Sequence, residues 1–481
     1  MFGGQEVTAG GPRVVYPLDG AMHPANILDL AIQWQGLSPP QARIYRLRLK
    51  NARGMMDFYT SCSAVECIYQ VLPKDWQAVG DANRDSDVSL TVAAAGDGAT
   101  VPTSPAIQIH FTPTSVAGGL YYWSTAKSGI YRLTFGQSKA VPFIDDPASC
   151  HGCHSVSRNG KQIAWVDYGS MGPFRGPGMT SIRSAPTDAP PPTAATTRIN
   201  GTGVALNPDG TRFVVTTGTS LALYDSITLA AVSTMTPGSL GTKSMMFLEW
   251  SPDGQNIALT VGTRLTTTQN GGFALADSDI AIVPFNNGQF GALRTLVAAG
   301  QDFHYYPTWS PDGKWIAFIS ASASDTTTLG PGTYDNNMGR LRLIAASGGT
   351  IHDLQRASLG LGTNTSWPKF APFSQLGGDL LFVGFSSKGD YGFSLKNSTV
   401  AVGMRRAQLW FAAIDLRRLS SGDPSWAPLW LPFQEVDQSN HIPLWTEVIG
   451  CLSDADCGPG SVCSRPAANQ PGQCHNTIVI P

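Results

Sequence analysis

The sequence predicts an all-β protein rich in turns, and three observations support this fold class. Only 14% of the 481 residues are charged, against roughly 25% in an average soluble domain, so the charged outer faces of a helical bundle are missing. The chain contains 52 glycines and 34 prolines, which interrupt helices and form turns. Short apolar runs of strand length follow these turns. A net charge of -2 provides no overall attraction to nucleic acid, and no apolar run reaches the ~18 residues of a transmembrane segment.

The first element is a β-sandwich predicted over residues 12–113. Five apolar or alternating runs of strand length are separated by turn signals, at residues 13–16, 30–34, 43–47, 88–92 and 106–111. About 100 residues with this pattern are typical of an immunoglobulin- or fibronectin-like domain. Cys62 and Cys67 are expected to form a local disulfide in one of its loops.

A candidate calcium loop lies within this region. Asp81, Asn83, Asp85 and Asp87 place side-chain oxygens at alternate positions, as calcium-binding loops do. The segment lacks a glycine at the sixth position and a glutamate at the twelfth, which here is Val92. We therefore expect a solvated loop, with a calcium site as the alternative.

The second element is predicted from a phrase that recurs between residues 156 and 320. It consists of a bulky residue, a polar residue, a tight turn ending in glycine, and an apolar strand. The best copies are at residues 250–260 and 309–320, and weaker ones are at residues 156–165 and 206–215. The turn glycines follow one another at intervals of about 50 residues, a period typical of propeller blades.

The phrase Trp-Ser-Pro-Asp-Gly at residues 250–254 and 309–313 resembles the WD-like repeats of TolB-type β-propellers. The resemblance covers residues 116–448 and implies a propeller in which this phrase joins the first two strands of a blade. A fifth copy, beginning at Trp367, has lost the turn.

A sixth blade is split between the two ends of the repeat region. Residues 119–124 and 129–133 have strand patterns but no first strand before them, and residues 442–446 imitate the missing strand. We therefore predict a six-bladed β-propeller, closed by residues 441–447 pairing with residues 119–124. Closure of this kind removes exposed sheet edges.

The third element is a short disulfide-rich tail, residues 449–481. Its four cysteines are Cys451, Cys457, Cys463 and Cys474. The tail has few apolar residues to bury, so we expect two disulfides in one of three possible pairings. With Cys62 and Cys67 they make six paired cysteines, which favours an exported protein. We expect a periplasmic or extracellular protein whose leader is absent from this chain.

The remaining cysteines stand in the sequence Cys150-His151-Gly152-Cys153-His154, which resembles c-type cytochromes in these five residues alone. Two thiols three residues apart can each form a thioether with a vinyl group of haem, and the next imidazole can reach the iron. We therefore predict one haem c, held by Cys150 and Cys153 with His154 as proximal ligand. The alternatives are a zinc site that also uses His151, and a disulfide or redox pair.

The sixth iron ligand has several candidates. Alignment of the repeats places His154 at the start of an innermost strand, at one rim of the ring near its axis. Electron-transfer haem proteins use a His or a Met opposite the proximal His. Candidates expected at this rim are His441, Met171, Met179 and His304, with the pair Met245 and Met246. We favour His441 because its strand closes the ring beside the haem blade; packing is the alternative role for the methionines.

These features predict an exported monohaem c-type cytochrome that transfers electrons through a haem on one rim of the propeller. The expected partner is a redox protein or a small molecule that reaches the haem; no nucleic-acid partner is expected. Two alternatives stay open. One is a binding module with a protein partner in the propeller channel and a structural or sensory haem, and the other is a peroxidase-like haem enzyme. The chain has no Gly-x-Ser-x-Gly motif that would indicate an attached hydrolase.

Overall fold

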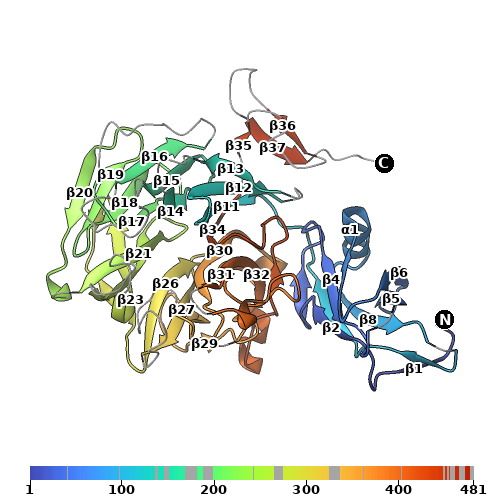
Figure 1. Ribbon diagram of the computed structural model, residues 1–481. Coiled ribbons are helices and arrows are strands. Elements are labelled where there is room, and N and C mark those ends of the chain that lie inside the picture. The colour runs from blue at the N-terminus through green and yellow to red at the C-terminus, as the bar shows by residue number, and fades with distance from the viewer. Residues whose placement is uncertain are drawn as a thin grey trace.

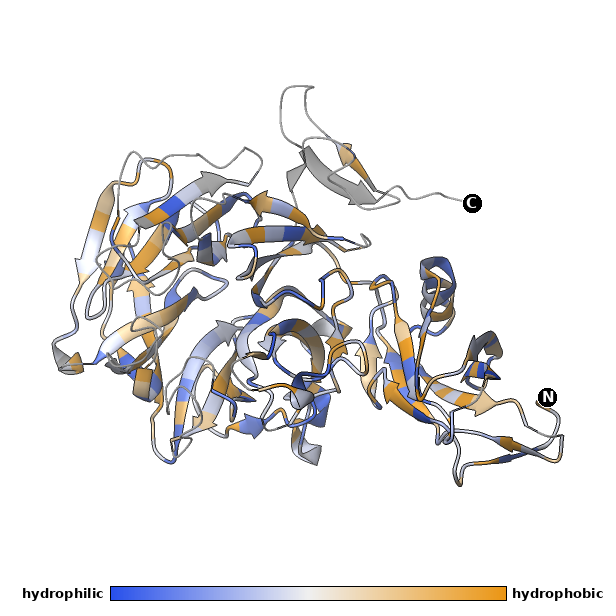
Figure 2. Ribbon diagram, viewed as in Figure 1, coloured by the Kyte–Doolittle hydropathy of each residue, from blue (hydrophilic) through white to orange (hydrophobic). Residues whose placement is uncertain are grey.

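The computed structural model contains an all-β chain (Figure 1) with one α-helix in its described part. The description covers residues 1–481 except 41, 97, 136–138, 146–150, 168–180, 188–198, 242, 265–274, 324–335, 361, 402–403, 448–449, 452–453, 455–460, 465–471 and 477–481. A ring of sheets stands beside a smaller group of N-terminal sheets. Apolar residues concentrate along the strands of both parts (Figure 2), where they form the buried core.

The N-terminal part contains two larger sheets and a short strand pair. The five predicted runs all lie on strands. One sheet has the order β2 (Arg13–Tyr16), β4 (Ala31–Gln35), β7 (Glu66–Gln70). The other has the order β3 (Ala21–His23), β10 (Ile107–Phe111), β8 (Asp87–Ala94), β5 (Arg43–Lys50), β6 (Met55–Cys62). The short pair is β1 (Gln5–Val7) with β9 (Thr100–Pro102).

The cysteine pair Cys62 and Cys67 forms a disulfide, as predicted. Its place differs from the expectation, because Cys62 ends β6 and Cys67 lies within β7. These strands belong to different sheets, so the disulfide closes the short connection between them and also joins the two sheets.

The helix α1 (Pro73–Ala82) is an element that the sequence patterns missed. Its Pro73 occupies the first turn, where the missing N–H costs nothing. Trp76 is fully buried and packs against Phe111, with ring centroids 5.1 Å apart. Gly80 allows this close docking, since a Cβ there would lie 2.7 Å from Ala25.

The proposed calcium segment begins on α1 and continues into a turn. Asp81 pairs with Arg84, while Asp85 and Asp87 both lie within 4 Å of His110. The three carboxylates are exposed, as expected for a solvated segment. The described residues contain no group of three His, Cys, Asp or Glu side chains arranged to hold a metal ion.

The described residues between Gly119 and Thr446 form a β-propeller of six antiparallel sheets around a common axis. Each sheet starts with an innermost strand, and the outer strands follow. The first three sheets are β14 (His151–Val156), β15 (Gln162–Asp167), β16 (Ser181–Pro186); β17 (Gly203–Leu206), β18 (Arg212–Thr216), β19 (Leu221–Asp225), β20 (Ala231–Met235); and β21 (Ser244–Trp250), β22 (Asn256–Arg264), β23 (Leu275–Asn286), β24 (Gln289–Phe290), β25 (Arg294–Val297).

The other three sheets complete the ring. They are β26 (Asp302–Trp309), β27 (Trp315–Ser322), β28 (Arg340–Ala345), β29 (His352–Asp353); β30 (Ser366–Gln375), β31 (Leu380–Ser387), β32 (Gln408–Asp415), β33 (Leu429–Trp430); and β34 (Asn440–Thr446), β11 (Gly119–Ser124), β12 (Gly129–Thr134), β13 (Val141–Ile144). The repeated phrases lie at the turn between the first two strands, where Gly254 and Gly313 adopt positive φ angles of 71°.

The ring is closed by strands from its two ends, and this confirms the predicted pairing. Strand β34 pairs antiparallel with β11, from Gly119 opposite Thr446 to Ser124 opposite Asn440. Trp445 of β34 is buried and stacks on Phe135, with ring centroids 4.9 Å apart. The closing strand therefore contributes both hydrogen bonds and core packing.

A β-bulge recurs in five of the described innermost strands. A residue with positive φ stands at each of them: Cys153, Phe247, Tyr306, Trp367 and Ile442. The pairing register shifts at each of these positions. A bulge adds one residue to a strand and redirects its side chains. The recurrence indicates that the innermost strands bend in the same way around the axis.

The N-terminal sheets dock on β33 and on the loop that follows β31. The hydroxyl of Tyr16 accepts a hydrogen bond from the backbone of Trp430, and Trp430 stacks on Tyr391 at 3.9 Å between ring centroids. Gln33 Oε1 accepts hydrogen bonds from the backbone N–H groups of Phe393 and Ser394. The buried polar groups in these contacts are hydrogen-bonded between the N-terminal sheets and the propeller. The contacts therefore fix the orientation of the N-terminal sheets relative to the propeller.

The tail contributes β35 (Gly450–Cys451), β36 (Ser461–Ser464) and β37 (Gly472–Asn476), which form a small sheet. Cys463 is disulfide-bonded. Cys457 and the side chains of Cys451 and Cys474 lie outside the described residues, so the connectivity of the tail stays a prediction. Within the described part of the chain, no helix is long and apolar enough to cross a membrane.

Ring closure is tested by truncation. A chain ending at residue 438 lacks β34 and leaves the inner edge of β11 unpaired, so we expect aggregation and a lower melting temperature. A chain ending at residue 447 retains β34 and serves as the control. Light scattering after size exclusion measures the outcome. Equal size distributions and melting temperatures for the two truncations would show that β34 does not hold the ring closed.

Buried His23 predicts a specific pH dependence. Both of its ring nitrogens are buried without hydrogen-bond partners among the described groups, and burial lowers its pKa from 6.5 to about 3. Its contribution to stability is complete above pH 6.5 and declines as the pH falls toward 3, by up to about 1.4 kcal/mol per pH unit. In His23→Leu, the free energy of unfolding should change less between pH 7 and pH 4.5 than in the parent. Urea unfolding at both pH values measures this, and equal changes would contradict the prediction.

Candidate functional site

The motif Cys150-His151-Gly152-Cys153-His154 leads into the innermost strand of one sheet. His151 is the first residue of β14, whereas Cys150 lies outside the described residues. A Cβ at Gly152 would lie 2.6 Å from the Trp123 ring, so this position accepts only glycine beside that indole. Cys153 is the bulge residue, with φ of 38°. The motif is thus part of a propeller strand.

His154 is the most unusual residue of this strand. It is 5% exposed, and neither ring nitrogen has a partner in hydrogen-bonding geometry among the described groups. Burial lowers the pKa of His154 from 6.5 to about 3; the backbone of Tyr121 opposes this shift, and the charge of Lys369 adds to it. The imidazole is therefore neutral at physiological pH. One of its ring nitrogens then has a lone pair that can accept a hydrogen bond or bind a metal ion.

His441 lies on β34, which contacts β14 in the ring. It is half-buried; its Nδ1 is buried and lacks a hydrogen-bond partner among the described groups. Its ring lies 5.9 Å from that of Trp123, the indole that also covers Gly152. Burial lowers the pKa of His441 to about 3. The structure thus brings the strand of His441 beside the motif.

The remaining sixth-ligand candidates are less favourably placed or outside the description. His304 lies on β26, and its Nδ1 is hydrogen-bonded to Ser320 Oγ at 2.8 Å. Met245 and Met246 are buried in apolar core clusters of β21 and its neighbours. Met171 and Met179 lie outside the described residues.

An aromatic cluster occupies the axis of the ring next to Cys153. The bulge residues Phe247, Tyr306 and Trp367 contact one another, with ring centroids 4.0 to 5.2 Å apart. Cys153 and Ile442 belong to the same apolar core region. The positive φ angles of these residues therefore place large side chains where the innermost strands converge.

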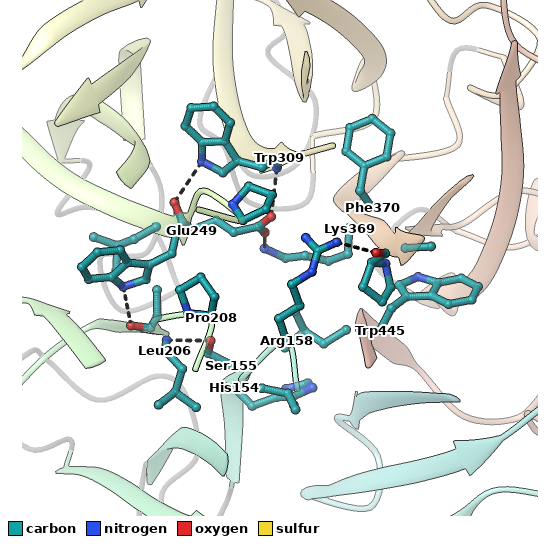
Figure 3. Close-up of a pocket in the computed structure, with 18 of the residues that line it drawn as sticks. His154, Ser155, Arg158, Leu206, Pro208, Glu249, Trp309, Lys369, Phe370 and Trp445 are labelled. Carbon is teal, nitrogen blue, oxygen red and sulfur yellow. Dashed lines mark hydrogen bonds and ion pairs between the residues drawn. The ribbon is translucent and has the colours of Figure 1, made fainter. Parts of the chain in front are cut away.

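Below this cluster the axis contains a polar pocket of about 110 Å³ (Figure 3). Its walls come from all six innermost strands or the turns that follow them, and they include His154, Arg158, Glu249 and Lys369. The volume suits a few waters or a small ion. It is smaller than a porphyrin.

Glu249 links three sheets across this pocket. Its carboxylate accepts hydrogen bonds from Thr308 Oγ1 at 2.8 Å and from the backbone N–H of Trp309 at 2.9 Å. The other oxygen pairs with the ammonium of Lys369. On the far wall, Arg158 donates to the carbonyl of Pro372 at 2.5 Å.

Sequence patterns did not identify this charged group. Glu249 and Lys369 are 120 residues apart, so no local spacing joins them. The available signal was a charged residue directly before a bulky residue in two of the repeats, Glu249 before Trp250 and Lys369 before Phe370. A charge within an apolar strand indicates a buried partner.

Comparison with known proteins identifies no family for this chain. No family model matches the chain, and no curated protein matches it. Among solved structures, TolB from Acinetobacter baumannii has a TM-score of 0.42 and 12% identity over 83% of this chain and 82% of that one. A nidogen/laminin complex has a TM-score of 0.38 and 15% identity over 64% and 93% of the chains. The dihydro-heme d1 dehydrogenase NirN has a TM-score of 0.35 and 13% identity over 65% and 53%.

The sheets themselves define this chain as a β-propeller protein, because antiparallel sheets of mostly four strands follow one another around one axis. Identities of 12 to 15% with TM-scores of 0.35 to 0.42 carry no inference about this chain. What these proteins bind or convert is therefore not transferred to this chain.

The axial ion pair predicts a large stability effect. Glu249→Ala leaves the ammonium of Lys369 and the Thr308 and Trp309 donors unpaired in a partly buried pocket, and should cost roughly 3 kcal/mol. Glu249→Gln retains the size and one acceptor, and should cost less. Asp81→Ala, which breaks an exposed pair with Arg84, should cost under about 1 kcal/mol. Urea unfolding measures all three, and similar losses at positions 249 and 81 would refute a role for the axial pair.

Proposed function

We propose that this protein is an exported monohaem c-type cytochrome that transfers electrons through a haem attached at one blade of a propeller. The complete Cys150-x-x-Cys153-His154 motif carries the proposal. The state of His154 supports it: its imidazole is buried, and neither ring nitrogen has a partner in hydrogen-bonding geometry among the described groups, which is costly in a protein interior. Binding to iron would satisfy one of them.

The spacing of the motif suits the attachment of a haem. Cys150 and Cys153 would hold it by thioethers, and His154 would bind the iron. Burial keeps His154 neutral at any pH well above about 3, and only a neutral imidazole binds a metal ion. When bound, haem supplies one-electron redox chemistry. The axial pocket is too small and too polar for the macrocycle, so the proposal does not place it there.

His441 is the favoured sixth ligand. Its strand is adjacent to β14, its Nδ1 is unpartnered among the described groups, and burial keeps it neutral. Met171 and Met179 lie outside the residues that the structure describes and stay candidates. The hydrogen bond between His304 and Ser320 counts against His304 as a ligand. Two protein ligands would exclude substrate from the iron, which favours electron transfer over a peroxidase-like activity.

The wider organisation is part of this proposal. We assign residues 12–113 to an immunoglobulin- or fibronectin-like domain, residues 116–448 to a TolB-like six-bladed propeller and residues 449–481 to a Cys-rich tail. The disulfide Cys62–Cys67 supports export to the periplasm or beyond, since such bonds persist in oxidising compartments. The partner would be a redox protein or a small molecule that reaches the haem edge.

A binding function in the propeller channel is the second candidate. The observation that favours it is the axial pocket, where the charges of Arg158, Glu249 and Lys369 meet. A channel with fixed charges can recognise a partner's polar group. In that case the haem would be structural or sensory.

Denaturing mass spectrometry tests haem attachment. The protein, exported from a host that matures c-type cytochromes, should be about 616 Da heavier than the polypeptide, the mass of the cofactor itself. Cys150→Ala combined with Cys153→Ala should abolish the addition. The matched control, Cys62→Ala with Cys67→Ala, also removes two cysteines but should retain the haem. An unmodified parent mass from such a host would refute the proposal.

Visible spectroscopy of the same protein separates electron transfer from the alternatives. Narrow low-spin bands require two axial ligands, and His441→Ala should then give high-spin bands. An unchanged low-spin spectrum in His441→Ala would assign the position to another residue, such as Met171 or Met179. Rapid binding of carbon monoxide to the ferrous parent would indicate an open sixth position and count against electron transfer.

A further inference from the structure

A second pocket lies in the N-terminal part, between α1 and the end of the hairpin that β5 and β6 form (Figure 1). Its volume is about 210 Å³, larger than that of the axial pocket. Its described walls come from residues 49–56, from residues 78–83 and from Val88, and none of them belongs to the propeller. The pocket is therefore independent of the proposed haem and of the axial charges.

Most of the wall is apolar. Leu49, Val79 and Val88 line the pocket and are at most 4% exposed. Met56 is half-buried, whereas Met55 is 64% exposed. Methionine side chains are flexible and adapt to the shape of an apolar ligand. The wall therefore offers an alkyl chain a surface that the fold itself leaves partly uncovered.

The two amide side chains of the wall already have partners within the protein. Asn51 Nδ2 donates to Asn83 Oδ1, and Asn83 Nδ2 donates to the carbonyl of Val79 at 2.7 Å. Asn51 Oδ1 accepts hydrogen bonds from the backbone N–H groups of Arg53 and Gly54, at 2.8 and 3.3 Å. These bonds hold the hairpin against the end of α1. They also satisfy both amides, so the pocket does not need a neutral polar ligand to pair them.

The charges among the described lining residues are both positive. Lys50 and Arg53 are exposed, and neither forms an ion pair with a described residue. Arg53 Nη1 donates to the carbonyl of Ala82 at 3.3 Å, so the guanidinium lies between the hairpin and α1. The acidic residues of these two elements nearest in sequence, Asp57 and Asp81, pair with other arginines and do not line the pocket. A ligand here meets apolar side chains and uncompensated positive charge.

We infer that this pocket binds a medium-chain fatty acid. The alkyl chain would lie against Leu49, Met56 and Val79, and the carboxylate would pair with the guanidinium of Arg53, a geometry that arginine favours. A cavity of about 150 Å³ holds the six carbons of benzene, so in proportion the present one holds a chain of roughly eight carbons. Octanoate is therefore the probe, and the test needs no haem.

Methyl NMR of the full-length protein, labelled with [13C-methyl]methionine, tests the inference. Titration with octanoate should shift the signals of Met55 and Met56, which Met55→Leu and Met56→Leu assign. The signals of Met245 and Met246, buried in the propeller, should stay in place. Octylammonium has the same chain with the opposite charge and should bind at least about fivefold more weakly. Absence of shifts at both Met55 and Met56, or equal affinity for the two probes, would overturn the inference.

Arg53→Gln separates the charge from the apolar contacts. Octanoate affinity should fall about threefold, the effect of losing one exposed ion pair, while octylammonium affinity stays the same or rises. Lys74→Gln is the matched control, since Lys74 is an exposed cation of α1 that does not line the pocket. Equal octanoate affinities in the two variants would contradict pairing of the carboxylate with Arg53.

Ala78→Phe tests the apolar part of the pocket. Ala78 is exposed and lines the pocket, so a phenyl ring there should occupy the space of the alkyl chain and abolish octanoate binding. Because the change lies at the surface, the melting temperature should stay close to that of the parent. Octanoate affinity equal to that of the parent would show that the chain does not enter this pocket.

Discussion

The pairing of β34 with β11 is the interaction on which the rest of the propeller depends. The first propeller strand in the chain, β11, begins at Gly119. Its inner partner β34 follows only after the strands of the other five sheets. All internal features need this closure. The axial pocket has walls from six converging strands, and the neutral state of His154 follows from its burial among them.

A second constraint is the bulge that recurs in the innermost strands. It places Phe247, Tyr306 and Trp367 in contact at the axis, and the same position in β14 is Cys153. The cysteine motif therefore occupies a position that the fold already bends in four other strands. Gly152 beside Trp123 shows the cost of this arrangement, because no side chain fits there. The motif is compatible with the propeller because its glycine and its second cysteine coincide with the close approach and the bulge.

The sequence predicted those parts of the fold that depend on local patterns. The Trp-Ser-Pro-Asp-Gly phrases located the turns before β22 and β27, and the likeness between residues 442–446 and 306–310 located the closing strand. Features that depend on distant residues could not be found in this way. Glu249 and Lys369 meet across the axis, and Ser124 meets Asn440 only after closure. The helix α1 was missed because its ten residues bury mainly Trp76 and Val79, too few for a clear helical period.

Ring closure also determines the order of steps in the folding of this protein. Thr125 and Ser439, which share a hydrogen bond at the closing seam, are 314 residues apart in the chain. Contacts between such distant segments form late, because the intervening chain must first lose its conformational entropy. Cys153 and His154 lie in the first sheet after β13, so during synthesis they appear long before β34. If the proposed haem is attached to this motif, the attachment can take place while the ring is still open, before the last strand is added.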